Sequence, residues 1–281
     1  MTGYGSRRGF KAFDYARLAA LAALSVSVLM GTGCISKLKA RDNLNQGVNA
    51  FKSGNYSDAA DHFKTAIALD PTFDVARLYL ATAYVQQYIP GTETPENKKY
   101  ATAAMGEFQT VLNANPDASS RLLATQSLAS LYYNMGDRVN AAAWNKKVIA
   151  LDPKNKEAYY TLGVLPWQEF LAPDRTARLN EKMRPEDPAP LKDAKERDAL
   201  KEKYWQPLTD GIEYEKKALA VDPEYDIAMA YMNLLIRYRA DLDDSKDQAT
   251  ADVKEADRWV EKALETQKIK AQRKAENPNA K

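Results

Sequence analysis

The sequence predicts an all-α protein built from a row of similar helical hairpins, and three observations lead to this prediction. Apolar residues recur at helical spacing over residues 40–270, and no segment alternates apolar and polar residues as a strand would. Four segments end in nearly the same letters, closing on Pro71, Pro116, Pro153 and Pro223. Because proline lacks the N–H that a helix interior requires, each of these positions marks the end of one helix and the approach to the next. A unit that recurs along a chain is typical of a solenoid.

The pattern ahead of these prolines resembles the tetratricopeptide repeat (TPR), in which each unit consists of two helices, A and B. Small residues recur where paired helices approach closely, and large ones fill the space between neighbouring pairs. The first copy carries Gly47, Phe51, Gly54, Tyr56, Ala59, Phe63, Ala66 and Pro71. The resemblance implies a right-handed superhelix of about five repeats, which fall at about 40–73, 74–118, 122–155, 156–225 and 226–270, followed by a basic tail at 271–281.

The repeats are longer than the plain unit of about 34 residues. The four prolines are 45, 37 and 70 residues apart, and the extra residues fall mainly between helices A and B, as insertions at 88–99, 168–210 and 239–254. All A–B turns of a superhelix lie along one edge, so we expect these insertions to project from one rim, which is a candidate interface. Neutral decoration of solvent-facing turns is the alternative. The largest insertion holds a proline cluster and a charged stretch, Leu191 to Gln206, which we expect to be an exposed helix. We expect the insertion to form a lid or arm, and a solvated spacer is the alternative.

The first 33 residues are typical of an export signal. Four basic side chains precede an unbroken apolar run of 13 residues, Leu18 to Met30. A bilayer-spanning helix needs about 20 residues, whereas this length suits the apolar centre of a signal peptide. Ser6 to Phe10 (SRRGF) also resembles the twin-arginine export motif. The twin-arginine and general secretory routes both stay open.

Directly after the apolar run comes Gly31-Thr32-Gly33-Cys34, which resembles the lipobox of bacterial lipoproteins, although Gly31 stands where an aliphatic residue is usual. The resemblance implies that Cys34 carries a diacylglyceryl group and an N-acyl chain, with 34–39 as the lipidated N-terminus and a short tether. Two or three acyl chains hold a protein firmly on a membrane. Ile35 follows the cysteine where inner-membrane lipoproteins carry Asp, so the enterobacterial sorting rule implies the outer membrane, facing the periplasm. A free thiol near an ordinary leader is the alternative.

Composition limits the remaining chemistry. One cysteine and one histidine exclude an internal disulfide and the His/Cys clusters that hold zinc, so we expect no metal and no cofactor beyond the lipid. Beyond Cys34 the chain has one more acidic than basic side chain, which makes nucleic acid an unexpected partner. No phosphate-binding loop or nucleophile elbow is present, and we expect no catalysis.

The TPR resemblance implies a protein that binds other proteins or peptides, here envelope proteins, with the inner face of the A helices. The candidate contacts on that face are aromatic or polar: Phe51, Gln86, Tyr133, Asn134, Tyr160, Trp167, Arg237 and Tyr238. Aromatic side chains give large contact areas, although packing in the core is the alternative for each of them. The main hypothesis is therefore a membrane-anchored scaffold or adaptor. The alternative is a periplasm-facing receptor that holds a small molecule or glycan under the insertion 168–210, and the sequence does not predict the oligomeric state.

Overall fold

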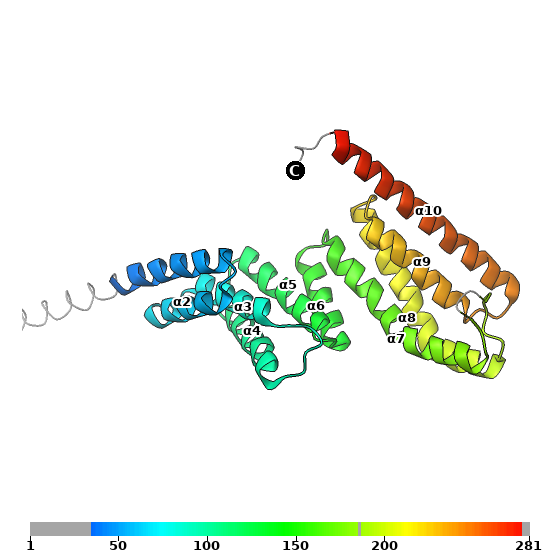
Figure 1. The fold of residues 1–281 in the computed structure, drawn as a ribbon, viewed down its shortest axis with the longest axis horizontal. Coiled ribbons are helices and arrows are strands. Elements are labelled where there is room, and N and C mark those ends of the chain that lie inside the picture. Colours follow the sequence, from blue (N-terminus) through cyan, green and yellow to red (C-terminus); the bar gives the residue numbers. More distant parts are fainter. Residues whose placement is uncertain (1–34, 185–186, 277–281) are drawn as a thin grey trace, which may run out of the picture. The chain divides into compact units, whose positions relative to one another are not determined.

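The computed structural model describes residues 35–184 and 187–276, and every regular element in these ranges is a helix (Figure 1). Residues 35–52 are helical and are followed by α2 (Tyr56–Leu69), α3 (Asp74–Gln87), α4 (Pro95–Asn113), α5 (Ala118–Asn134), α6 (Arg138–Leu151), α7 (Lys156–Asn180), α8 (Ala194–Val221), α9 (Asp226–Ala240) and α10 (Lys246–Glu276). The all-α prediction is confirmed. No helix in the described ranges is both long and apolar enough to cross a membrane.

The recurring prolines occupy one structural position, after a B helix and before the next A helix. At three of them the preceding aspartate ends the helix: Asp70, Asp152 and Asp222. Each carboxylate accepts a hydrogen bond from the backbone N–H two residues on, at 3.0–3.1 Å. An aspartate that bonds its own backbone in this way forms a tight turn. The repeated Asp-Pro pair therefore both stops helix B and turns the chain toward the next helix A.

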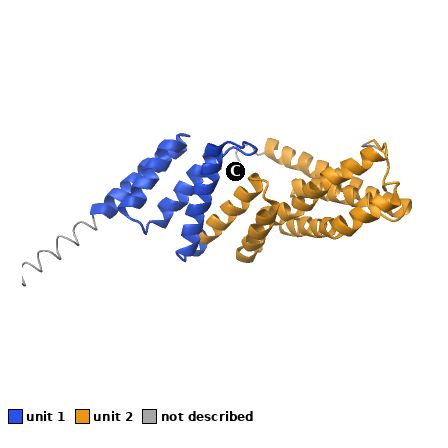
Figure 2. Ribbon diagram, turned by 90° about the horizontal axis from the view of Figure 1, so that it is seen from below, with its two compact units in different colours: residues 1–120 blue, residues 121–281 orange. Residues whose placement is uncertain are grey.

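Two compact units make up the chain, residues 1–120 and 121–281 (Figure 2). In the first unit, α2 packs on α3 and α3 on α4, and Phe63 lies in the core with its side chain fully buried. A Cβ on Gly47 would lie 2.4 Å from Cε1 of Phe63. Glycine is therefore required at this position for the first helix to lie against α2.

The second unit has its largest core where α7, α8, α9 and α10 meet. Consecutive helices pack on one another, and α7 also contacts α9, which is the next A helix. Phe170, Leu208 and Met232 are fully buried in this core. A Cβ on Gly211 would lie 3.0 Å from the carbonyl oxygen of Gly163, so these two glycines allow α7 and α8 to approach closely.

The ranges predicted as insertions, 88–99, 168–210 and 239–254, lengthen helices more than they form loops. Only 88–94, 181–193 and 241–245 lie between the helices. The fourth repeat shows the reason, because α7 runs through both Pro166 and Pro173. A proline inside a helix costs about 3 kcal/mol. Beyond Pro166, however, α7 buries Phe170 and Ala177 completely, and burial of that face offsets the cost.

The turns of the fourth and fifth repeats lie side by side in the second unit. The N–H of Leu191 donates to the carbonyl oxygen of Asp241 at 3.0 Å, and Leu191 is fully buried. Leu191 is therefore packed against the turn 241–245.

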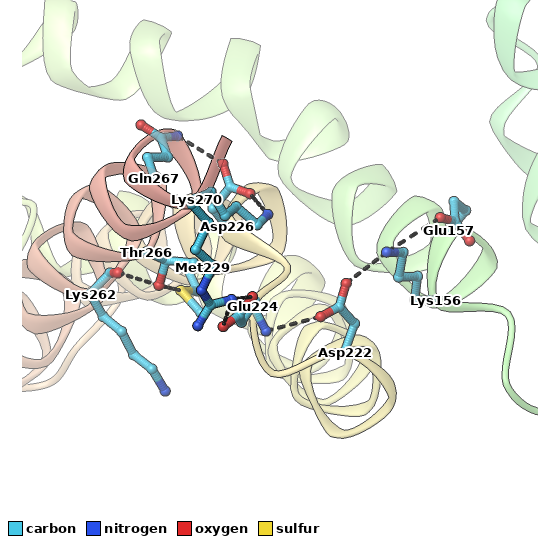
Figure 3. Close-up of polar contacts among 11 residues, drawn as sticks. Lys156, Glu157, Asp222, Glu224, Asp226, Met229, Lys262, Thr266, Gln267 and Lys270 are labelled. Carbon is cyan, nitrogen blue, oxygen red and sulfur yellow. Dashed lines mark hydrogen bonds and ion pairs between the residues drawn. The ribbon is translucent and has the colours of Figure 1, made fainter. Parts of the chain in front are cut away.

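Both ends of the described chain are more helical than expected. Residues 35–39, predicted as a tether, belong to the first helix, and 271–276, predicted as a tail, belong to α10. At the C-terminal end, the Lys270 ammonium lies 2.5 Å from an oxygen of Asp226 at the start of α9 (Figure 3). Arg273 pairs with Glu224 at 2.8 Å. These ion pairs tie α10 to the start of α9. Cys34, the leader and 277–281 lie outside the described residues.

Candidate functional site

A hollow of about 400 Å³ opens between α5 and α7, with α6 forming part of its wall. It is lined by Gln126, Ala129, Ser130, Tyr133, Asn145, Val148, Asn155, Glu157, Ala158 and Thr161. Because α5 and α7 are successive A helices, this hollow lies on the face where the sequence predicts a ligand. Of the predicted contact residues, it contains Tyr133.

The hollow combines an apolar floor with polar walls. Ala129, Val148 and Ala158 form one buried cluster at its base. On the walls, the Tyr133 hydroxyl accepts a hydrogen bond from Nε2 of Gln168 at 2.9 Å, which fixes the position of the ring. Asn155 caps α7 by accepting from the N–H of Ala158 at 2.9 Å. An extended peptide needs both features, since its side chains require apolar pockets and its backbone requires polar partners.

A row of interleaved aromatic rings joins α7 to α9. Tyr160 and Trp167 lie seven residues apart on α7, and Tyr231 and Tyr238 lie seven apart on α9. Ring centroids are 5.3 Å apart for Tyr160–Tyr231, 5.4 Å for Trp167–Tyr231 and 6.2 Å for Trp167–Tyr238, each pair meeting edge to face. Such pairs contribute about 0.5–1.5 kcal/mol each beyond the area that they bury. The row therefore holds the two A helices together and leaves its half-buried edges available to a ligand.

The remaining predicted contact residues are not among those that line the hollow. Phe51 packs in the core of the first unit, with its ring 5.1 Å from that of Tyr56. Gln86 and Asn134 are exposed at the ends of α3 and α5. Arg237 is held by Asn233 at 2.8 Å and by Asp257. Sequence reasoning missed Tyr231, although its spacing of seven from Tyr238 was available as a signal.

Comparisons with known proteins agree with this fold. A family model described as tetratricopeptide repeat matches residues 50–87. The crystal structure of MamA superposes with a TM-score of 0.52 at 17% identity, covering 80% of this chain and 96% of that chain. MamA 41-end from Desulfovibrio magneticus RS-1 gives 0.53 at 16% identity, covering 82% of this chain and 96% of that chain. MamA is a TPR protein. This chain has the TPR fold. At these identities the likeness concerns the fold alone, and no curated protein matches the chain in sequence.

A second and larger cavity of the TPR array, about 760 Å³, lies in the turn region of the fourth and fifth repeats. Its lining comes from the end of α7, the segment 181–193, α9 and α10: Asp174, Arg175, Arg178, Leu179, Met183, Asp187, Pro188, Ala189, Arg237, Tyr238, Asp241, Ala249, Thr250 and Val253. Two predicted contact residues, Arg237 and Tyr238, thus belong to this cavity. From the sequence, a binding site under the insertion 168–210 was predicted only in the alternative hypothesis, that of a receptor for a small molecule or glycan.

Arg178 is the centre of a buried ionic network in the wall of this cavity. Its Nε and Nη2 donate to the two carboxylate oxygens of Asp241 at 2.8 and 2.6 Å. Its Nη1 donates to the carbonyl oxygens of Arg184 and Asp187 at 3.2 Å. Burial and the neighbouring charge of Asp241 raise the pKa of Asp174, which lies 3.7 Å from Arg178. Near neutral pH the Asp174 carboxyl group is therefore protonated. Burial also raises the pKa of Asp241, and the charge of Arg178 opposes this rise.

Glu215 lies at the contact between α7 and α8, and it is a buried acid without a hydrogen-bond partner. Its side chain has no exposure to solvent, and neither carboxylate oxygen is hydrogen-bonded. Burial raises its pKa to about 9. A Cβ on Gly163 would lie 2.3 Å from Oε1 of Glu215, so the glycine leaves the space that the carboxyl group fills.

In the part of the chain that the structure describes, no group of three or more His, Cys, Asp or Glu side chains is arranged to hold a metal ion.

Proposed function

We propose that this chain is a lipid-anchored scaffold of the bacterial cell envelope, and that it binds a peptide segment of other envelope proteins without catalysing a reaction. The observation that carries the proposal is the hollow between α5 and α7, on the inner face of successive A helices. The TPR fold supports an interaction scaffold in general. The apolar floor and polar walls favour a peptide over a charged terminus.

Filling the hollow with a large side chain should prevent the partner from binding. Ser130 lines the hollow and is exposed, so Ser130→Trp blocks the space without disturbing the core. Cross-linking in cells followed by mass spectrometry should recover the partner with the unaltered chain. With Ser130→Trp the yield should fall by about tenfold or more, the loss expected when a central contact of an interface is blocked.

The matched control is Ala143→Trp on α6, which is also exposed and lies outside the hollow. It should recover the partner as the unaltered chain does. Equal recovery by a folded Ser130→Trp variant would show that the partner binds elsewhere.

The membrane anchor is tested separately at Cys34, the only cysteine of the chain. We expect Cys34→Ala to abolish incorporation of radiolabelled fatty acid and to release the protein from the outer membrane into the soluble periplasmic fraction. Acyl chains supply about 0.8 kcal/mol of membrane affinity per buried CH₂, so their loss should be decisive. Unchanged membrane retention of the variant would contradict the anchor.

A second candidate function, a receptor for a small molecule or glycan, is favoured by the larger cavity. Its volume of about 760 Å³ is within the range of small-molecule sites. Native mass spectrometry tests the receptor by looking for a compound that stays bound to the protein. Binding that is lost in the Ala189→Trp variant and kept in the Ser130→Trp variant would favour the receptor over the scaffold.

A further inference from the structure

The first helix leaves almost no chain between the lipidation site and the folded first unit. Ile35, directly after Cys34, is already helical, and Ala40 is fully buried. Five residues of helix span about 8 Å. An acyl anchor on Cys34 therefore brings the start of this helix to the membrane surface itself, with no flexible tether between them.

The start of this helix combines exposed apolar and basic side chains. Ile35 is 58% exposed and Leu38 is 69% exposed, and their spacing of three places them on one face. Lys37, Lys39 and Arg41 are exposed among them. Such a combination is typical of helices that lie in the interface of an anionic membrane.

Neighbouring acids offset only part of this positive charge. Asp42 is exposed on the same helix. The pKa of Asp70 is lowered, first by its hydrogen bond from Thr72 and to a smaller extent by Lys37 and Arg41, which therefore lie within electrostatic range of it. Three exposed cations, Lys37, Lys39 and Arg41, therefore stand beside two acids, Asp42 and Asp70, in this region.

The basic residues also stand at the end of a helix where a cation is unfavourable. With Cys34 as the first residue of the exported chain, Lys37 and Lys39 fall in the opening turns of the helix. The first turns of α2, α3 and α4 each contain an acid: Asp58, Asp74 and Glu96. Acids are favourable there because the helix dipole is positive at its N-terminus. Cations at this position receive no electrostatic stabilisation from the helix dipole, whereas a negatively charged surface outside the protein would stabilise them.

We infer that residues 35–41 form a second membrane contact next to the lipid anchor. Ile35 and Leu38 enter the boundary between headgroups and acyl chains, and Lys37, Lys39 and Arg41 bind the phosphates of anionic lipids. The inference rests on the proposed anchor at Cys34, because that anchor presents this face to the bilayer. Its consequence is that the first repeat is held in a fixed orientation on the membrane.

A reversible anchor makes the second contact measurable, since one acyl chain alone gives only marginal membrane binding. The chain from Cys34 to Lys281 is coupled at Cys34 to a single acyl maleimide, and its partitioning into vesicles is measured. On phosphatidylcholine vesicles with about one third phosphatidylglycerol, we expect Lys37→Gln/Lys39→Gln to weaken partitioning by about tenfold. On phosphatidylcholine alone this difference should vanish, whereas Leu38→Ser should weaken partitioning severalfold on both vesicles.

The matched control is Lys52→Gln/Lys64→Gln, which removes two exposed lysines of the same unit outside the proposed contact and should partition as the unaltered chain does. Equal partitioning of all variants would overturn the inference. Because the acyl chain is attached chemically, this result is independent of whether cells acylate Cys34, which the labelling experiment decides.

Discussion

Replacing Glu215 by glutamine is expected to stabilise the protein by about 2–4 kcal/mol at pH 8 and much less at pH 5. Burial raises the pKa of this carboxyl group to about 9 in the folded chain, whereas a glutamate in an unfolded chain titrates near pH 4.3, about its ordinary value. Between these two values the folded state keeps a proton that the unfolded state releases. The free energy of unfolding therefore falls as the pH rises through this window.

Glutamine fits the same space as the protonated acid and does not titrate, so it removes this pH-dependent loss. Urea unfolding of the variant and of the unaltered chain, at pH 5 and at pH 8, measures this loss. The loss is taken as the difference between the two proteins, because Asp174 and Asp243 also have raised pKa values and contribute to the pH dependence of both. Glu213→Gln is the control, since Glu213 is exposed on the same helix and pairs with Lys216 at the surface. It should change stability by no more than about 0.5 kcal/mol. Identical unfolding of Glu215→Gln and the unaltered chain at both pH values would mean that the native carboxyl group is not protonated.

The fold could be predicted because its determining signals are local and repeated. The Asp-Pro turns need only the aspartate carboxylate and the missing proline N–H, both of which are visible in sequence. Gly47 and Phe63 likewise follow the spacing of small and large residues that the repeat resemblance supplies, and the structure brings them into contact.

The insertions could not be predicted because their structure depends on partners far along the chain. Pro166 and Pro173 read locally as helix breaks. What keeps α7 helical through them is the burial of Phe170 against Tyr204 of α8 and Tyr238 of α9, with centroids 5.0 and 6.2 Å apart. No local pattern contains these contacts.

The candidate site was predictable in type but only partly in detail. Tyr133, Tyr160, Trp167 and Tyr238 were correctly placed on A helices from helical spacing. Which of them face an open hollow depends on how neighbouring repeats pack, and only Tyr133 lines the one between α5 and α7. The buried acids give no signal in sequence, because Glu215 and Asp174 look like ordinary surface residues until the helices that cover them are in place.

Replacing Arg178 by methionine is expected to destabilise the second unit by about 3–5 kcal/mol at pH 8, the cost of leaving a buried charge without its partner. Asp241 is 2% exposed and would lose both hydrogen bonds from the guanidinium group. The carbonyl groups of Arg184 and Asp187 would lose their donor as well, so hydrogen exchange in 181–193 should accelerate.

The pH dependence separates the charge from the packing of the long side chain. Without the cation, burial of Asp241 is no longer opposed by the charge of Arg178, and the pKa of Asp241 rises further. The variant then folds with both Asp174 and Asp241 protonated. Protonating these carboxyl groups on folding costs less free energy at pH 5 than at pH 8. The destabilisation measured by urea unfolding should therefore shrink as the pH falls. Lys146→Met, an exposed change on α6 of the same unit, should be nearly neutral at both pH values. Adding Asp241→Asn to Arg178→Met should recover much of the lost stability, because no ionised group is then buried alone. A loss that is equal at both pH values and unaffected by Asp241→Asn would assign the role of Arg178 to its aliphatic stem instead of its charge.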